Sequence, residues 1–213
     1  MLKTLLVSLL AAAPAAPSFA APSLAAPSDA AYPLQCLYAA KAQGGELQSN
    51  EHCARADGDT VAFAAPALAS MDFDADGLSP VYTHGSWRWV RPDGKSAAVV
   101  TFDNFADDFE DGLARGPLSG GMAYYDTQLN RVLATPYDWV DRFRDGLAVV
   151  CQGCHKVYTA GGEHSVMAGG QWGAIDRQGA LLMPLRADVA NLMREVEAAR
   201  EVEAARADRA TGG

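Results

Sequence analysis

Beyond its first 20 residues, this sequence lacks two features that would define its surroundings. It has no later apolar run of about 18 residues, the length that a membrane-spanning helix needs. It also has no cluster of Lys and Arg, and its 17 basic and 26 acidic residues leave a formal net charge of −9. Nucleic acids and anionic membrane surfaces both attract clustered positive charge. We therefore expect neither a nucleic-acid partner nor a membrane span.

Motifs for catalysis are missing as well. No Ser or Cys lies in a recognisable nucleophile motif, and no glycine-rich phosphate loop precedes a helix. A group of neighbouring acids is typical of a solvated turn rather than of an acid/base pair, and it comprises Asp107, Asp108, Glu110 and Asp111. The sequence therefore predicts a protein that is not an enzyme.

One acidic segment resembles the start of a calcium loop. Asp72, Asp74 and Asp76 occupy the first, third and fifth positions of such a loop, and Gly77 occupies the sixth. The twelfth position is Thr83 rather than Glu, and no flanking helices are expected. We interpret this segment as a junction between repeats.

The first 20 residues have the three parts of a secretory signal peptide. Lys3 supplies the charged start, an apolar stretch runs over 5–13, and Ser18 and Ala20 fit a cleavage site after residue 20. This stretch is too short to anchor the chain in a bilayer. A leader rich in Ala, Pro and Ser follows at 21–33. We therefore expect a periplasmic or secreted protein.

An internal repeat runs through 71–186 with a period near 35 residues. Its signal is Phe followed by Asp-Gly-Leu, and Gly77, Gly112 and Gly146 lie 35 and 34 residues apart. Each Gly-Leu begins a strand, and two more strands separated by a turn follow it. The second strands are expected at 87–90, 122–126 and 172–176, and the third strands at 97–102, 132–134 and 180–183.

The predicted fold class is therefore mainly β, an array of three-stranded antiparallel meander repeats. A single meander leaves its periodic Phe and Leu exposed, so neighbouring units must stack or extend the sheet to bury them. This gives Phe and Leu a packing role.

The last copy carries the most complete pattern. It reads Gln-Trp-Gly-Ala-Ile-Asp-Arg-Gln-Gly at 171–179, with Tyr-Asp at 137–138 and Phe-Arg-Asp-Gly-Leu-Ala at 143–148 upstream. This pattern resembles the WG (Trp-Gly) repeat family, and the similarity covers about 71–184. The two earlier copies lack the full Trp-Gly pair. The resemblance implies a β-rich array, and it implies little about activity.

The N-terminal segment 34–70 is a candidate degenerate copy. Pro66 and Phe73 are separated by seven residues, as are Pro136 and Phe143, and the Asp-Gly pair at 57–58 is a candidate turn.

The segment 187–213 differs from the array, because from Asp188 it is rich in Ala, Glu and Arg and favours a helix. A tandem six-residue repeat does not keep Val196 and Val202 on one helical face. The sequence therefore predicts a C-terminal solvated α-helix, a charged tail.

The last copy also contains about 15 additional residues, at roughly 151–165. Met122 and Trp172 are 50 residues apart, whereas Trp87 and Met122 are 35 apart. We expect this insert to form a loop. It contains Cys-Gln-Gly-Cys-His at 151–155 and is the place where specific chemistry is expected.

One interpretation of the insert is a cofactor or metal site. Cys-x-x-Cys-His is the attachment motif of c-type haem, with Met167 or Met183 available as a second axial ligand. Alternatively, two thiolates and two imidazoles would bind zinc. The haem ligands would be Cys151, Cys154 and His155, and the zinc ligands Cys151, Cys154, His155 and His164.

The favoured interpretation of the insert is a disulfide. An even number of cysteines in an exported protein indicates paired thiols, and four cysteines allow three pairings. Cys151 with Cys154 would pinch the insert, and Cys36 with Cys53 would staple the N-terminal segment. On this interpretation the protein has no cofactor and no metal.

The leading functional hypothesis is an exported, non-catalytic module that binds a protein or another component of the cell envelope. Its candidates for packing and ligand contact are aromatic residues, namely Trp87, Trp89, Tyr124, Tyr125, Trp139 and Trp172. The alternative hypothesis is a haem- or zinc-binding protein that uses the Cys-x-x-Cys-His insert.

Overall fold

The computed structural model describes residues 31–58, 60–162 and 164–211. The predicted signal peptide and most of the predicted leader lie outside the described residues. Tyr32, near the end of that leader, packs against the first hydrophobic core, so the described fold includes it.

Antiparallel strands dominate the described chain, which confirms the predicted mainly β class. They form sheets of six, three, four and two strands, in the orders β3-β2-β1-β4-β5-β6, β11-β10-β9, β12-β13-β14-β15 and β7-β8. In the N-terminal half the strands are β1 (Leu34–Ala39), β2 (Leu47–Asp57), β3 (Thr60–Phe63), β4 (Ser79–Thr83), β5 (Ser86–Val90), β6 (Ser96–Ala98), β7 (Thr101–Phe102) and β8 (Phe105–Ala106).

The C-terminal half contains longer strands and the longer helix. Its strands are β9 (Leu113–Leu118), β10 (Gly121–Asp126), β11 (Arg131–Thr135), β12 (Trp139–Val140), β13 (Leu147–Tyr158), β14 (Ser165–Asp176) and β15 (Leu181–Arg186). The helices of the described chain are α1 (Ala65–Ser70), α2 (Val189–Thr211) and the short 3-10 helix η2 (Lys41–Gln43). Neither α-helix is both long and apolar enough to cross a membrane.

The strands fall into consecutive antiparallel meanders. We name β1-β2-β3 meander 1, β4-β5-β6 meander 2, β9-β10-β11 meander 3 and β13-β14-β15 meander 4. The middle strands of meanders 2, 3 and 4 contain the three predicted second strands. Meander 1 is formed by the N-terminal segment, with the Asp-Gly pair at 57–58 next to the β2–β3 turn, and it joins meander 2 edge to edge through β1 and β4.

Tight turns explain the Asp-Gly part of the repeated signal. Asp111 and Gly112 have φ angles of 50° and 73°, and Glu110 and Leu113 exchange backbone hydrogen bonds of 3.1 and 2.9 Å. The Asp-Gly pair at 145–146 has the same turn, with φ angles of 49° and 77°. Two successive positive φ angles favour Asp followed by Gly, because glycine reaches this conformation without steric cost.

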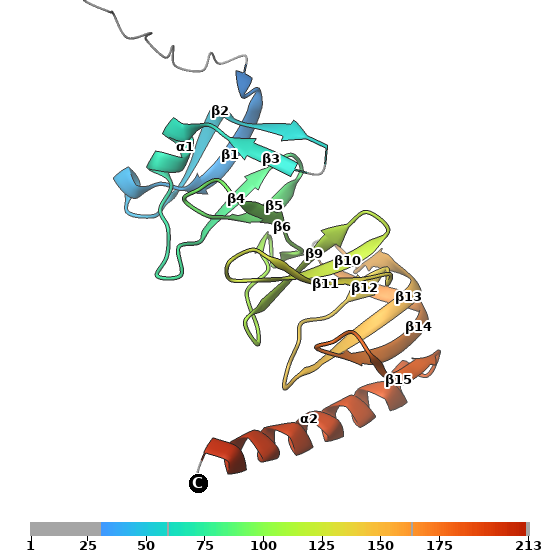
Figure 1. The fold of residues 1–213 in the computed structure, drawn as a ribbon. Coiled ribbons are helices and arrows are strands. Elements are labelled where there is room, and N and C mark those ends of the chain that lie inside the picture. Colours follow the sequence, from blue (N-terminus) through green and yellow to red (C-terminus); the bar gives the residue numbers. More distant parts are fainter. Residues whose placement is uncertain (1–30, 59, 163, 212–213) are drawn as a thin grey trace, which may run out of the picture.

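Meanders 2, 3 and 4 follow one another along the molecule (Figure 1). Hydrophobic clusters lie between meanders 2 and 3, between meanders 3 and 4, and between meander 4 and α2. Phe143 is fully buried between meanders 3 and 4, as its predicted packing role requires. In β13, Ala148 and Val150 face meander 3, whereas Val149 and Cys151 face α2. Both faces of the first five residues of β13 are covered, so this part of its sequence is a continuous apolar run and does not alternate.

The C-terminal helix is present, but it is not solvated along its whole length. Asp188 accepts a hydrogen bond from the Asn191 N–H at 3.0 Å, which caps the helix start. Leu192 and Val196 are 0% and 1% exposed because they pack on the outer face of meander 4, whereas Val202 is 50% exposed. The prediction of a solvated helix is therefore wrong for the first turns, whereas most of the described side chains after residue 200 are exposed. An open apolar sheet face needs a cover, and α2 supplies it.

Candidate functional site: the arm and the cleft beneath it

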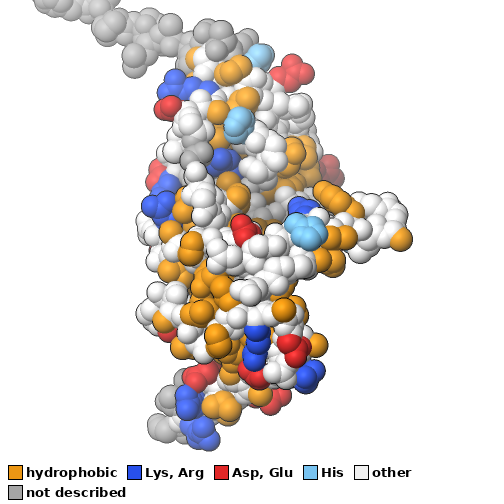
Figure 2. Space-filling model, turned by 90° about the vertical axis from the view of Figure 1, so that its right-hand side faces the viewer, with side chains coloured by type: hydrophobic (Ala, Val, Ile, Leu, Met, Phe, Trp, Pro, Cys, Tyr) orange, Lys and Arg blue, Asp and Glu red, His pale blue; other side chains and the backbone are white. Residues whose placement is uncertain are grey.

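The additional residues of the last copy lengthen a hairpin and do not form the loop that we predicted. β13 and β14 pair in one register from Leu147 opposite Asp176 to Tyr158 opposite Ser165. The insert adds nearly equal lengths to both strands, with Val157 opposite Val166, and β-branched pairs of this kind favour an extended ladder. We call residues 152–162 and 164–171 the arm. Its side chains are mostly exposed, and Figure 2 shows a lobe that projects from the body.

Both favoured disulfides are present. Cys36 and Cys53 join β1 to β2, with their Cα atoms 5.7 Å apart. Cys151 and Cys154 are joined within β13, at the base of the arm, across three sequence positions.

The predicted haem and zinc ligands do not converge on one site. Both interpretations need cysteines that are not in a disulfide, as thiols for the thioether bonds to haem or as thiolates for zinc, whereas the sulfurs of Cys151 and Cys154 are bonded to each other. Met167 pairs with Lys156, the neighbour of His155, so His155 and Met167 face opposite sides of the hairpin. Met183 packs in the cluster under α2. Among the described residues, no three His, Cys, Asp or Glu side chains are grouped so as to hold a metal ion.

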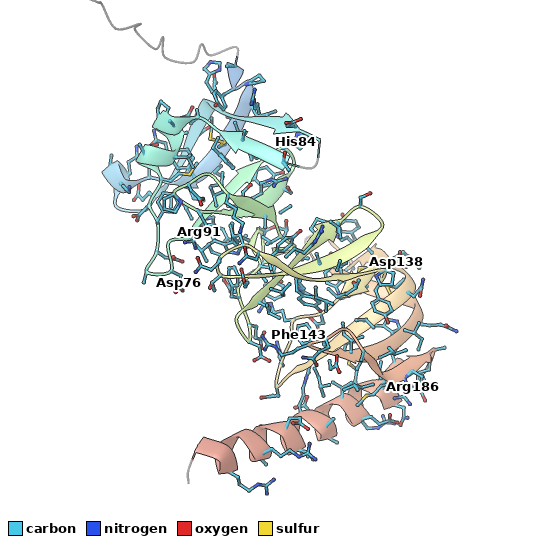
Figure 3. The ribbon with its side chains drawn as sticks, in the orientation of Figure 1. Asp76, His84, Arg91, Asp138, Phe143 and Arg186 are labelled. Carbon is cyan, nitrogen blue, oxygen red and sulfur yellow. A yellow bond between two sulfur atoms is a disulfide. The ribbon has the colours of Figure 1, made fainter. Side chains whose placement is uncertain are left out.

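The calcium-like segment forms a turn, as we interpreted it. The Asp74 carboxylate accepts hydrogen bonds from the N–H groups of Asp76 and Leu78 at 2.9 and 2.8 Å. Asp76 in turn offers its carbonyl to Arg91, at 3.3 Å (Figure 3). The carboxylate that a calcium ion would need is thus used to order the turn before β4.

A cleft of about 690 Å³ lies where the arm, the body and α2 meet. Its size is within the range of small-molecule and peptide sites. The large apolar side chains that line it are Phe102, Met122, Trp139, Met167, Trp172 and Met193. Its charged lining residues are Arg115, Asp138, Asp141 and Lys156. The cleft therefore combines an apolar floor with a balanced set of charges.

Hydrogen bonds position the two tryptophans and the base of the arm. Cys151 pairs with Trp139 on one side and with Trp172 on the other. The Trp172 indole N–H donates to the Gly169 carbonyl at 2.7 Å. The Asp138 carboxylate accepts the Gly153 N–H at 2.6 Å, and Asp138 lies beside the β13–β14 sheet in Figure 3. The wall of the cleft is therefore attached to the same residues that begin the arm.

A buried ion network lies behind the cleft, around Arg115. The Arg115 guanidinium is 2.7 Å from the Asp107 carboxylate and 2.9 Å from that of Asp141, and its centre lies 4.6 Å from the Trp139 ring. Arg142 also pairs with Asp107. Asp107 and Asp141 each stand two residues before the repeated Phe, so one arginine joins the same position of two successive units.

The interpretation of Asp107 as a solvated carboxylate is wrong. Its side chain is 0% exposed, because two arginines that are distant in the sequence enclose it. Asp108 is exposed, as predicted, whereas Glu110 is partly buried and pairs with Arg144 at 2.7 Å, and the Asp111 carboxylate accepts the Gly146 N–H at 3.0 Å. A charge can be buried where close opposite charges and hydrogen bonds replace its hydration.

Tyr124 borders this ion network, and its phenol is neutral. Burial raises the pKa of its phenol well above the ordinary value of 10.0, and the nearby Arg115 only partly offsets this. The Tyr124 hydroxyl donates to the Asp141 carbonyl at 2.5 Å. It therefore acts as a fixed hydrogen-bond donor over the whole physiological pH range.

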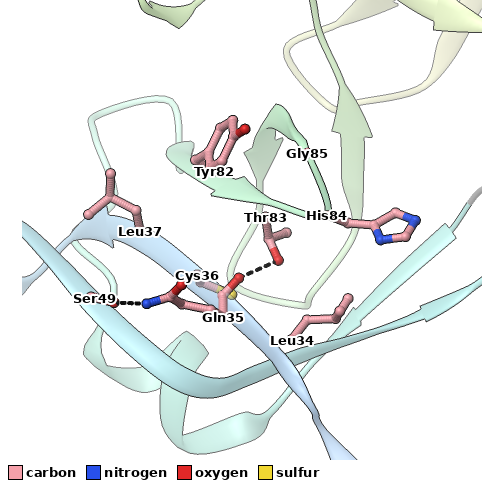
Figure 4. A pocket seen from close by; sticks show the side chains of 9 residues that line it. All are labelled: Leu34, Gln35, Cys36, Leu37, Ser49, Tyr82, Thr83, His84 and Gly85. Carbon is pink, nitrogen blue, oxygen red and sulfur yellow. Dashed lines mark hydrogen bonds between the residues drawn. The ribbon is translucent and has the colours of Figure 1, made fainter.

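A second hollow, of about 440 Å³, lies on the N-terminal sheet (Figure 4). Its floor is formed by β1 and β4. The Gln35 side chain donates to Ser49 at 2.7 Å, and the main-chain carbonyl of Gln35 accepts the Thr83 hydroxyl at 2.7 Å. These polar groups satisfy each other, so this hollow offers fewer open contacts than the cleft.

The aromatic candidates divide between packing and lining. Trp87, Trp89 and Tyr124 are buried in the clusters between meanders, whereas Trp139 and Trp172 line the cleft. The sequence analysis did not identify the lining residues Phe102, Lys156 and Met193. No periodic signal marks them, because they come from a two-stranded hairpin, the arm and the helix.

Comparisons with known proteins do not add to this description. No family model matches the sequence, no curated protein is significantly similar to it, and no solved structure matches the fold.

Proposed function

We propose that this chain is an exported, non-catalytic binding module of the cell envelope, related to the WG-repeat family, and that it holds its partner in the cleft beneath the arm. The observation that carries the proposal is the apolar floor of that cleft, where two tryptophans and three methionines lie together. The two disulfides agree with an oxidising compartment outside the cytosol.

The partner that fits this cleft best is a protein segment with apolar side chains. Tryptophan and methionine are enriched at protein interfaces, where aromatic rings give large contact areas and methionine adapts to different shapes. Met193 is 42% exposed on the accessible face of α2, so part of this apolar surface is open to a partner. The charges of Lys156 and Asp138 would orient such a segment.

The charged groups of the cleft support a non-catalytic role. Arg115 and Asp141 bind each other, and Asp138 holds a backbone N–H of the arm. General acid/base catalysis needs a group that can exchange a proton with a substrate. Carboxylates held by arginine or by the backbone are better suited to order the cleft wall.

A binding experiment with an apolar probe tests the site. The fluorescent anion 8-anilinonaphthalene-1-sulfonate should bind the folded protein and increase in emission. Met193→Glu should weaken this binding several-fold, because it places a carboxylate on the apolar floor. Leu182→Glu is the matched control, since Leu182 is 55% exposed on β15 and does not line the cleft.

Peptide selection then tests the class of partner. Peptides selected from a random displayed library on the wild-type protein should carry apolar residues, and they should lose affinity for the Met193→Glu variant alone. Equal binding to wild type and to both variants, by probe and by peptides, would contradict the proposed site.

The haem or zinc alternative has its own test. Protein from the secretory fraction of its own host should show an intact mass four hydrogens below that of the reduced chain, as two disulfides require. A haem-sized addition with a Soret band, or bound zinc, would favour the alternative instead.

A further inference from the structure

The two disulfides of this chain lie in different surroundings. Cys36 and Cys53 are both 0% exposed within the first hydrophobic cluster. Cys151 is also 0% exposed, but Cys154 is only partly buried, and Gln152 and Gly153 between them are exposed. A reductant can therefore approach the sulfur of Cys154 without opening a core, whereas it must disrupt the N-terminal sheet to approach Cys36 or Cys53.

The exposed disulfide bridges the boundary between body and arm. Cys151 belongs to the cluster beneath α2, together with Trp172 and Leu192. Cys154 lies in the part of β13 that belongs to the arm, immediately after Gly153. The bond therefore ties a residue of the packed core to a residue of the projecting hairpin.

Glycines make this boundary pliable. Gly153, Gly169 and Gly170 have φ angles of 76°, 73° and 66°. At Gly170 a Cβ atom would lie 2.4 Å from the Gln152 carbonyl oxygen, so the two strands approach too closely for any side chain. Glycine adds little restraint of its own, because it has wide conformational freedom. The β13–β14 pairing continues on both sides of these glycines, and at the boundary it is supplemented by the disulfide and by the hydrogen bonds that Gly153 and Gly169 make to Asp138 and Trp172.

We propose that the Cys151–Cys154 bond is a latch that fixes the arm to the body. A dithiol reductant opens it by attacking the sulfur of Cys154. A thiolate of the reductant attacks the Cys154 sulfur, and the Cys151 sulfur leaves as a thiolate and takes up a proton. The second thiol of the reductant then attacks the mixed disulfide and releases Cys154 as a thiol. The products are two protein thiols and an oxidised dithiol. The latch does not depend on what the cleft binds.

The motif is a substrate of this exchange and not its catalyst. Reactive Cys-x-x-Cys motifs have a thiolate stabilised at a helix N-terminus, whereas Cys151 and Cys154 lie in the middle of a strand. The protein should therefore accept electrons from a dithiol and should not reduce other proteins at a useful rate.

Selective reduction of the wild-type protein is the first test. The folded chain is incubated with increasing dithiothreitol, quenched with iodoacetamide and digested, and the labelled cysteines are quantified by mass spectrometry. Cys151 and Cys154 should be half-labelled at a dithiothreitol concentration about tenfold or more below that for Cys36 and Cys53. Labelling of both pairs together, or of Cys36 and Cys53 first, would overturn the proposal.

Hydrogen exchange measures what the latch does. In protein reduced only at Cys151 and Cys154, the amides of 154–158 and 165–169 should exchange faster, and those of β9 and β10 should not change. The Cys151→Ser/Cys154→Ser variant should reproduce this pattern, and the Cys36→Ser/Cys53→Ser variant should leave the arm unchanged. If the arm exchanges at the same rate before and after reduction, the bond is not a latch, whether or not the serine variants fold.

Discussion

The interface between meanders 3 and 4 and the interface beneath α2 are built from different chemistry. The first places Asp107 and Arg115, 0% and 4% exposed, beside the apolar cluster around Phe143. The second is mainly apolar, with Leu192 and Val196 of α2 against meander 4 and a partly exposed ion pair between Arg186 and Glu195. A buried ion network requires every partner to be present, whereas an apolar contact loses stability in proportion to the area removed. The interface between meanders 3 and 4 should therefore be specific and sensitive to single substitutions. The interface beneath α2 should tolerate substitutions better.

Removal of the central carboxylate should give the largest effect. Asp107→Ala leaves two arginines, Arg115 and Arg142, without the charge that both contact. We expect a loss of about 3–5 kcal/mol in the free energy of unfolding, measured by urea denaturation, because breaking a buried pair leaves an uncompensated charge. Asp108→Ala is the control and should change stability by no more than about 0.5 kcal/mol, since Asp108 is exposed. Similar effects of both substitutions would show that the network does not hold the interface.

Truncation of the helix anchor should cost somewhat less. Leu192→Ala removes a fully buried side chain from the interface beneath α2, and we expect a loss of about 3 kcal/mol. The neighbouring Met193→Ala serves as its control, because Met193 is 42% exposed. Circular dichroism and urea denaturation should show a loss of helix docking for the first variant alone. A solvated helix would instead tolerate both changes equally.

The losses of stability caused by removing each of the two disulfides should differ by a smaller amount. Chain-entropy arguments assign about 3 kcal/mol to the loop closed by Cys36 and Cys53, which are 17 positions apart, and about 2 kcal/mol to the loop closed by Cys151 and Cys154, 3 positions apart. We expect serine variants of the first pair to have the lower denaturation midpoint. A larger loss for the second pair would mean that the arm contributes more to the body than its exposure indicates.

The smallest expected effect is a pH dependence of helix docking. The Arg186 guanidinium, which is hydrogen-bonded to Glu195, holds the pKa of that carboxyl below its ordinary value of 4.5. The stabilisation is therefore fully present above about pH 4.5 and is lost as the pH falls through the lowered pKa. Helix content at pH 6 should be higher in the wild type than in Glu195→Gln, and the difference should disappear as the pH falls to 3, because only the wild type has this titration. Identical profiles would show that this ion pair does not contribute to the docking of α2.

The sequence predicts local structure well where one residue type is required by the backbone. The Asp-Gly turns before β9 and β13 and the middle strands of meanders 2, 3 and 4 lie where the pattern places them. Cys151 and Cys154 were also identified as a pair, although their place in a strand was not. The arm was predicted as a loop. An insert between two strands lengthens both of them only if its two halves can pair with each other, and a local pattern does not show such pairing.

The candidate site could be predicted only in part, for a related reason. Trp139 and Trp172 were among the aromatic candidates, whereas Met193 and Lys156 were not, since nothing in their own neighbourhood marks them. The first turns of α2 were assigned to solvent because the six-residue repeat shows no apolar face. Two residues, Leu192 and Val196, are enough to dock the helix once meander 4 offers an uncovered apolar face.

The sequence by itself determines the Asp-Gly turns and the middle strands of meanders 2, 3 and 4, because these depend on steric preferences within a few residues. Tertiary structure alone decides which charges are buried, where the cleft lies and which disulfide is accessible. Asp107 looks like any acidic turn residue until Arg115 and Arg142 enclose it, and Cys154 differs from Cys53 only through what covers its sulfur. Burial is a property of contacts between distant segments, and a local pattern cannot specify it.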